Sequence, residues 1–198
     1  MPELTVQVIA GWVAGFLNLA AFVPYIVTMY RPDKPTRPNR VSWWIWFSVS
    51  LVIAPSYTIS GAHNTAWVAD ALVAGTLVVA LLLIRRGQGG WTRFDRACLL
   101  GAIVSGICWY VTGSALTGLF MAILADAFGV AGTMRQAYLD PHSESKVAWS
   151  LFFAGDLINL LAVQDWSLAS FPIWFYAIYM VGHTGPILAT LYYRTKTK

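Results

Sequence analysis

The sequence predicts an all-α membrane protein of seven transmembrane helices, arranged as two parallel three-helix repeats joined by a linker helix. The chain of 198 residues is 58% hydrophobic and only 11% charged, whereas a soluble domain of this size carries roughly 25% charged residues. Its apolar stretches are continuous over about 20 residues, the length that a helix needs to cross a bilayer core. Its Lys and Arg residues gather in every second connection between those stretches.

The apolar stretches follow one another through short connections, which leave little chain for a soluble domain between them. Because the runs are continuous, they favour helices over barrel strands, in which apolar and polar residues alternate. The first stretch has no basic segment before it and carries Glu3, so we do not expect a cleavable signal peptide. The seven expected spans cover residues 6–30, 41–60, 65–84, 97–112, 115–134, 147–163 and 170–193.

The distribution of the 13 Lys and Arg residues orients the chain. All of them follow the first, third, fifth and seventh spans, and the connections at 61–64, 113–114 and 164–167 contain none. Since Lys and Arg are retained on the cytoplasmic side, we expect the N-terminus outside and the C-terminus inside, in the cytoplasmic membrane of a prokaryote. The net charge of +4 then follows from topology, and a nucleic-acid partner is not expected.

An internal repeat relates the first three expected spans to the last three. Both repeats begin outside and end inside, so an extra crossing must join them, as in the parallel repeats of some secondary transporters. We therefore expect a first repeat at 1–86, a linker helix at 87–114 and a second repeat at 115–198. The matched pairs that indicate the repeat are Thr28 with Thr133, Met29 with Met134, Trp43 with Trp149 and Phe47 with Phe153.

Two segments carry a family resemblance. Val23-Pro24-Tyr25-Ile26 is followed by a basic connection and then by Ser42-Trp43-Trp44-Ile45-Trp46. This order is similar to the Pro-Gln motif, basic loop and Ser-containing second helix of the PQ-loop/SWEET superfamily, which the three-plus-one-plus-three plan also resembles. Tyr25 stands where that family has Gln, and Gly129-Val130 stands at the equivalent place in the second half. The resemblance implies a transporter, with proton coupling through membrane-embedded acids as in some members.

Three ionisable residues fall near the middle of different expected spans. Counted at about 1.5 Å per residue from the nearest basic boundary, Asp126, Asp156 and His183 all lie roughly 14–17 Å deep. A charged Asp at such a position costs about 2.5–3.5 kcal/mol on insertion scales. We expect the three side chains to face one polar cavity and to hold a proton or a cationic group. The alternative is a hydrogen-bonded group that only fastens the helices together.

Aromatic and polar residues at helical spacing extend this site. On the sixth expected span, Trp149, Phe152 and Asn159 share one face. We expect aromatic rings to stack on a small polar solute and asparagine side chains to orient it. Pro24 and Pro186 each remove a backbone hydrogen bond inside a span, and we expect hinges there. The expected solute-binding residues are Asn18, Trp43, Trp149, Phe152, Asn159 and Tyr179.

The sequence therefore predicts a secondary transporter or facilitator that moves a small polar solute across the cytoplasmic membrane. Proton coupling is favoured because the two acids occur in one repeat only, with Ser50 and Ala21 at the positions equivalent to Asp156 and Asp126. The expected partners are the solute and the lipid bilayer, a homo-oligomer is left open, and no cofactor or metal site is expected. Two alternatives remain open: a receptor or scaffold that does not transport, and an intramembrane hydrolase that uses the two acids. The role of Asp70 is also left open.

Overall fold

The computed structural model describes residues 5–89 and 92–196, without the side chains of residues 98, 102, 105, 115, 195 and 196. Within these residues the regular structure is helical, and the only β-type pairing is an isolated bridge between Asn39 and Gln88. The prediction of an all-α chain is confirmed to that extent. The elements are α1 (Val6–Met29), α2 (Arg40–Ile59), α3 (Ala66–Arg86), α4 (Arg93–Thr112), α5 (Ala115–Leu139), α6 (Lys146–Asn159), the 3-10 turns η1 (Leu160–Ala162) and η2 (Leu168–Ser170), and α7 (Phe171–Lys196).

The helices begin and end within a few residues of the expected spans, with larger differences at the start of α4, at the end of α5 and at the end of α6, where the 3-10 turn η1 replaces the last turn expected. α4 begins four residues before the expected span, because Thr92 and Asp95 form a capping box. In it, the Thr92 hydroxyl accepts a hydrogen bond from the Asp95 backbone N–H at 3.1 Å, and the Asp95 carboxylate accepts one from the Thr92 backbone at 3.2 Å. α5 continues to Leu139, beyond the expected end at residue 134. The extra helix projects past the apolar stretch, which hydropathy alone does not indicate.

Four of the described helices are long and apolar enough to cross a membrane: α1, α3, α4 and residues Leu116–Leu139 of α5. The sequence predicts seven spans. α6 has only 14 residues, and α2 and α7 carry more Trp, Tyr, Ser and Thr than the other helices. These three helices also supply much of the polar interior of the molecule, through residues such as Ser50, Asp156 and His183.

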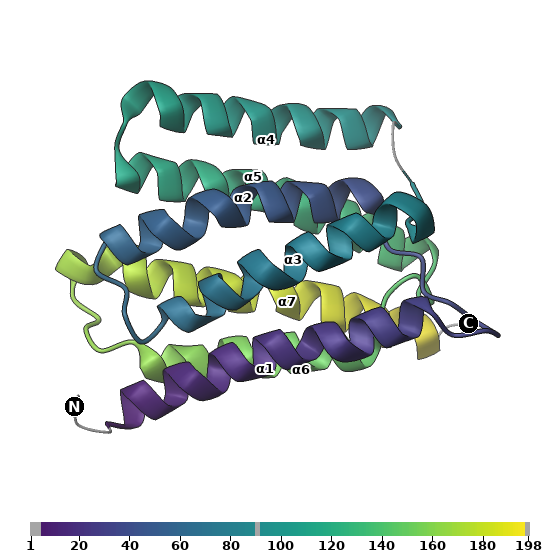
Figure 1. Ribbon diagram of the computed structural model, residues 1–198, viewed down its shortest axis with the longest axis horizontal. Helices are drawn as coiled ribbons and strands as arrows, with labels where there is room; N and C mark the ends of the chain where they lie inside the picture. Colours follow the sequence, from purple (N-terminus) through teal and green to yellow (C-terminus); the bar gives the residue numbers. More distant parts are fainter. Residues whose placement is uncertain (1–4, 90–91, 197–198) are drawn as a thin grey trace.

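The helices lie side by side along one long axis, with α4 at an edge beside α5 (Figure 1). The odd-numbered helices run in one direction and the even-numbered helices return (Figure 1). α3 contacts both α1 and α2, and α7 contacts both α5 and α6. The most extensive remaining contacts join α1 to α6 and α2 to α5. The interior is therefore enclosed by α1, α2, α3, α5, α6 and α7.

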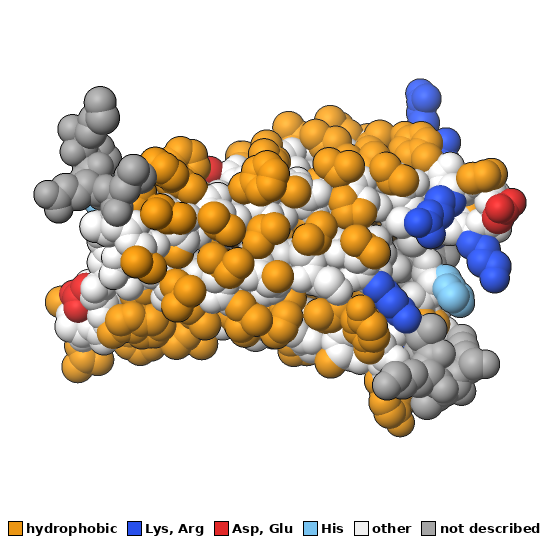
Figure 2. All heavy atoms as spheres, turned by 90° about the horizontal axis from the view of Figure 1, so that it is seen from below, with side chains coloured by type: hydrophobic (Ala, Val, Ile, Leu, Met, Phe, Trp, Pro, Cys, Tyr) orange, Lys and Arg blue, Asp and Glu red, His pale blue; other side chains and the backbone are white. Residues whose placement is uncertain are grey.

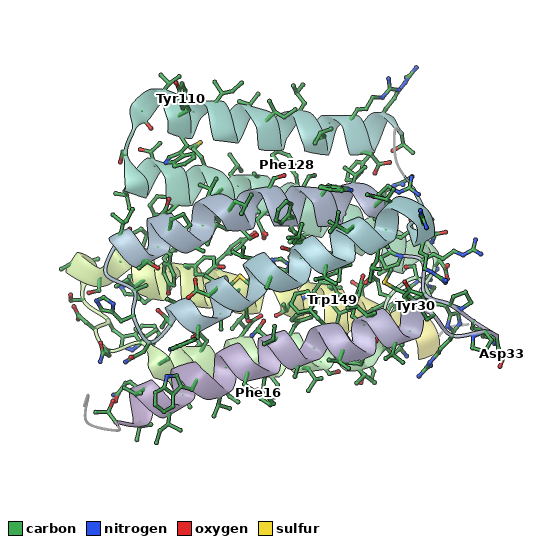
Figure 3. The ribbon with its side chains drawn as sticks, viewed as in Figure 1. Phe16, Tyr30, Asp33, Tyr110, Phe128 and Trp149 are labelled. Atoms are coloured by element: carbon green, nitrogen blue, oxygen red, sulfur yellow. The ribbon has the colours of Figure 1, made fainter. Side chains whose placement is uncertain are left out.

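The surface separates into an apolar flank and two polar ends. In Figure 2 hydrophobic side chains cover the flank, and Lys and Arg side chains gather at one end. We call this the basic end; α1, α3, α5 and α7 finish there, and α1 begins at the opposite end (Figure 1). Phe16 is 69% exposed and Tyr110 85% exposed on the flank, and both point outward in Figure 3, whereas Trp149 lies inside the bundle. An apolar flank of this extent is what lipid covers in a membrane protein.

Close backbone packing at Gly11 gives a direct test of the fold. A methyl group on Gly11 in α1 would collide with the backbone carbonyl of Asn64, whereas one on Gly106 in α4 would meet nothing within 4 Å. We expect Gly11→Ala to lower the free energy of unfolding by about 1–3 kcal/mol, because backbone atoms cannot move aside as a side chain can. Gly106→Ala should raise it by about 0.5–1 kcal/mol. Unfolding titrations in mixed micelles measure both, and equal effects would contradict the packing of α1 on the connection before α3.

Candidate functional site

A cavity of about 40 Å³ lies between the helices that enclose the interior. A single water molecule needs roughly 10–15 Å³ of such space, so this cavity has room for two or three. Most of its lining is aromatic or aliphatic. The lining residues with polar side-chain atoms are Asn18, Ser50, Thr76, Asp126, Tyr176, His183 and Thr184, together with the tryptophans Trp43, Trp46 and Trp149.

One wall of the cavity carries an acid–imidazole pair. Nδ1 of His183 in α7 lies 2.7 Å from Oδ2 of Asp126 in α5, and both side chains are buried. The Tyr179 hydroxyl donates a hydrogen bond to the same carboxylate oxygen at 2.7 Å. The His183 ring also packs against two indoles, with ring centroids 5.2 Å from Trp46 and 6.2 Å from Trp149. Aromatic faces stabilise a cation, so this wall can hold a proton on the imidazole or a cationic group.

The second acid, Asp156 in α6, has different partners. It is fully buried, and the side-chain amide of Asn18 in α1 donates to its Oδ1 at 3.3 Å. The Thr184 hydroxyl lies 2.9 Å from its Oδ2 and 3.0 Å from the carbonyl oxygen of Met180. Since that hydroxyl has one proton, it can donate to only one of these oxygens at a time. When it donates to Met180, the contact with Asp156 is a hydrogen bond only if the carboxyl itself carries a proton.

The structure brings most of the expected site residues together. The expected residues that line the cavity are Asn18, Trp43, Asp126, Trp149, Phe152 and His183. Asp156 is one hydrogen bond away, through Asn18 and Thr184. The two acids bind separate partners, and among the described residues no hydrogen bond joins one to the other. Nor do three or more His, Cys, Asp or Glu side chains form a group that could hold a metal ion in this part of the chain.

Other expected residues lie away from the cavity. Tyr179 lies behind Asp126, as its hydrogen-bond partner. Asn159 is buried near the end of α6 but is not part of the lining, and neither polar atom of its side chain has a hydrogen-bond partner. Pro24 and Pro186 lie inside the uninterrupted helices α1 and α7.

No family model, curated protein or solved structure matches the chain. The resemblance to the PQ-loop/SWEET superfamily therefore stays a prediction, and the site is interpreted from its own geometry.

A hydrogen-bonded group that the sequence analysis did not select lies at the basic end of the cavity. The Tyr25 hydroxyl donates to Oε2 of Glu144 at 2.6 Å, and the indole N–H of Trp149 donates to the same oxygen at 2.9 Å. The indole N–H of Trp43 donates to the Tyr25 oxygen at 3.0 Å. We call Tyr25, Trp43, Glu144 and Trp149 the Glu144 cluster. Trp43 and Trp149 were expected as solute-binding residues and Tyr25 stands at the Gln position of the family motif, whereas Glu144 carried no sequence signal.

Towards the opposite end, Tyr57 of α2 lies beyond the lining residue Tyr176. Its hydroxyl lies 2.8 Å from the Thr65 hydroxyl and 2.9 Å from the carbonyl oxygen of Ile173, so it links the first three helices to the start of α7. Its ring packs on Tyr176, a lining residue, with centroids 4.6 Å apart. The cavity is thus bounded by a hydrogen-bonded aromatic group on each side.

Proposed function

We propose that this chain is a secondary transporter or facilitator for a small polar solute, possessing seven membrane spans in the three-plus-one-plus-three arrangement of the PQ-loop/SWEET superfamily. The observation that carries the proposal is the central cavity, which has an acid–imidazole pair and indole rings in its wall and a hydrogen-bonded aromatic group at each end. A polar cavity between the two halves of the molecule is where secondary transporters of this plan bind their solute.

The helix contacts support two parallel repeats. If α1, α2 and α3 correspond to α5, α6 and α7, the contact of α1 with α6 corresponds to that of α5 with α2, and both occur. Likewise, α3 contacts α1 and α2 as α7 contacts α5 and α6. This exchange is what a two-fold axis along the membrane normal produces. α4 then is the linker, and α2, α6 and α7 are the additional spans, since they run alongside the four apolar ones (Figure 1).

The charge distribution supports an orientation. The basic end carries the connections that contain Lys and Arg (Figure 2), and such connections remain in the cytoplasm. We therefore propose that the N-terminus is outside, and that the cavity opens alternately to the cytoplasm past the Glu144 cluster and to the outside past Tyr57. Pro24 and Pro186 lie in helices of different halves, where a missing backbone hydrogen bond eases bending.

The two acids supply the proton-binding groups of this proposal. Asp126 with His183 would bind a cationic group or a proton beside the indoles. Asp156 would exchange a proton, because its contact with Thr184 can be made with the proton on either partner. Trp149 and Phe152 offer ring surfaces against which a planar part of the solute can pack.

Filling the cavity tests the transport function. Thermal-shift screening of the purified protein against sugars, amino acids, nucleosides and vitamins first selects a solute, whose uptake is then measured in proteoliposomes. Ser50 lines the cavity, whereas Ser48 on the same helix is exposed. We expect Ser50→Leu to reduce uptake at least tenfold, and Ser48→Leu to leave it within twofold. A solute that stabilises the protein without being taken up would favour the receptor or scaffold function instead.

A further inference from the structure

Glu144 is a buried acid outside the expected membrane spans. It lies in the connection between α5 and α6 at the basic end, and only 3% of its surface is exposed. Its Oε2 accepts two hydrogen bonds, from Tyr25 and Trp149, whereas its Oε1 has no hydrogen-bond partner. A buried carboxylate oxygen without a partner is costly when the group is charged. The site therefore favours a carboxyl group that carries a proton.

The surrounding charges do not offset this cost. The titratable group that faces Glu144 from α1 is Tyr25, while α2 contributes through Trp43, which bonds to Tyr25. On its own segment, Lys146 lies over the ring of Tyr192 in α7, with Nζ 5.1 Å from the ring centroid. Other charged groups of the basic end have partners of their own: Arg194 bonds to the Tyr138 carbonyl, Arg40 bonds to the carbonyls of Leu83 and Gly87, and Asp140 accepts from the His142 backbone N–H.

Among the described residues no ion pair involves Glu144. Burial accordingly raises the pKa of Glu144 to about 7, although the hydrogen bonds from Tyr25 and Trp149 lower it in part. A solvated Glu has a pKa near 4.3. The proton is therefore bound more tightly when the cluster is closed than when the carboxyl is exposed to water.

The Glu144 cluster joins the two halves of the molecule. Tyr25 and Trp43 belong to the first half, and Glu144 and Trp149 belong to the second. The rings of Trp43 and Trp149 line the cavity, while their indole N–H groups point into the cluster. The hydrogen bond between Tyr25 and Glu144 is the one that joins the halves, so separating them at the basic end requires this bond to break.

We infer that the Glu144 cluster is a proton-controlled gate, which holds the basic end of the cavity closed when Glu144 is protonated and releases it when Glu144 loses its proton to water. This inference rests on the proposed transport function, for which it supplies the regulation. Whether acid closes or opens the gate follows from the proton affinities of Glu144 in the closed and open forms. The closed form binds the proton more tightly, so acid favours closure. Opening increases as the pH rises from about 5, by up to tenfold per pH unit, and levels off above about 7.

Thiol labelling measures opening without any solute. In a variant with both native cysteines replaced by serine, Ser50→Cys reports the cavity, and His63→Cys reports an exposed position in the connection before α3, outside the expected spans. Dividing the labelling rate of the cavity thiol by that of the exposed thiol cancels the effect of pH on the reactivity of the thiol group itself. We expect this ratio to rise several-fold between pH 6 and pH 8. With Glu144→Gln, which keeps an accepting oxygen but cannot titrate, it should stay low at every pH.

NMR of the indole N–H groups tests proton binding independently. The Trp149 signal, assigned by its loss in Trp149→Phe, should titrate with a midpoint near pH 7 and stop titrating in Glu144→Gln. Asp140→Asn, on the same connection, is the matched control and should retain both responses. The gate is refuted if the labelling ratio of the parent protein is flat with pH, or if Glu144→Gln retains the rise. Failed uptake with an intact labelling response would instead refute transport alone.

Discussion

Replacing His183 by phenylalanine is expected to lower the free energy of unfolding by about 3–5 kcal/mol, because it leaves the buried carboxylate of Asp126 without its partner. The double variant Asp126→Leu/His183→Phe should recover most of this loss, since a buried ion pair replaced by apolar groups of similar volume is often close to neutral. Reversible unfolding in mixed micelles gives the four free energies of this double-mutant cycle.

An exposed histidine provides the control for this experiment, and a second hydrogen bond to Asp126 limits the expected loss. His63 is exposed in the connection before α3, so His63→Phe is a matched control that should change the stability by less than about 0.5 kcal/mol. The Tyr179 hydroxyl still donates to Asp126 in the single His183 variant, which keeps the loss at the lower part of the range. Additive effects of the two replacements would mean that the pair contributes no coupling energy, and would contradict the contact between them.

Replacing Asp156 by asparagine is expected to remove the proton-coupled part of the pH dependence of solute uptake and to leave the part that the Glu144 cluster imposes. The carboxyl is the group that exchanges a proton in the proposed cycle, and asparagine keeps its shape and its contacts with Asn18 and Thr184. The rate of uptake in proteoliposomes should then change between pH 5.5 and pH 8 only as the thiol-labelling ratio of the cavity does, whereas the parent protein should show a further change of up to tenfold per pH unit within the titration range of Asp156.

Asp70 provides the matched control for that prediction. It lies on the exposed side of α3, beside the apolar surface of Trp12, Phe16 and Trp67, and not in the central cavity. Asp70→Asn should therefore leave the pH response unchanged. A full pH response in Asp156→Asn would move the coupling group to the pair formed by Asp126 and His183, or leave an uncoupled facilitator.

The helices and the residues of the central polar group could be predicted from the sequence. Continuous apolar runs and short connections placed each helix to within a few residues, and counting depth from the basic boundaries brought Asp126, Asp156 and His183 to one level. Depth does not indicate rotation about the helix axis. The sequence therefore could not decide which acid meets His183, and the structure places Asp126 there.

The sequence patterns did not predict the surroundings of side chains that are decided by contacts between distant parts of the chain. Glu144 reads as a solvated acid of a polar connection, and its burial depends on Tyr25, which is 119 residues away along the chain. Helical spacing placed Asn159 on the face of Asp156, but it is one turn closer to the opposite end, beyond the cavity. Tyr179 shares a face with His183, yet its hydroxyl is used to hold Asp126.

The two ends of the cavity are closed by groups of different chemistry. Tyr57 contacts a threonine hydroxyl and a backbone carbonyl, none of which changes charge near neutral pH, whereas the basic end depends on a carboxyl group that does. In the proposed cycle, a change in cytoplasmic pH then alters the energy of one access state and leaves the other unaffected. Without solute, the protein would face outward when the cytoplasm is acidic and inward when it is alkaline. The orientation in which it waits for solute would therefore depend on the cytoplasmic pH.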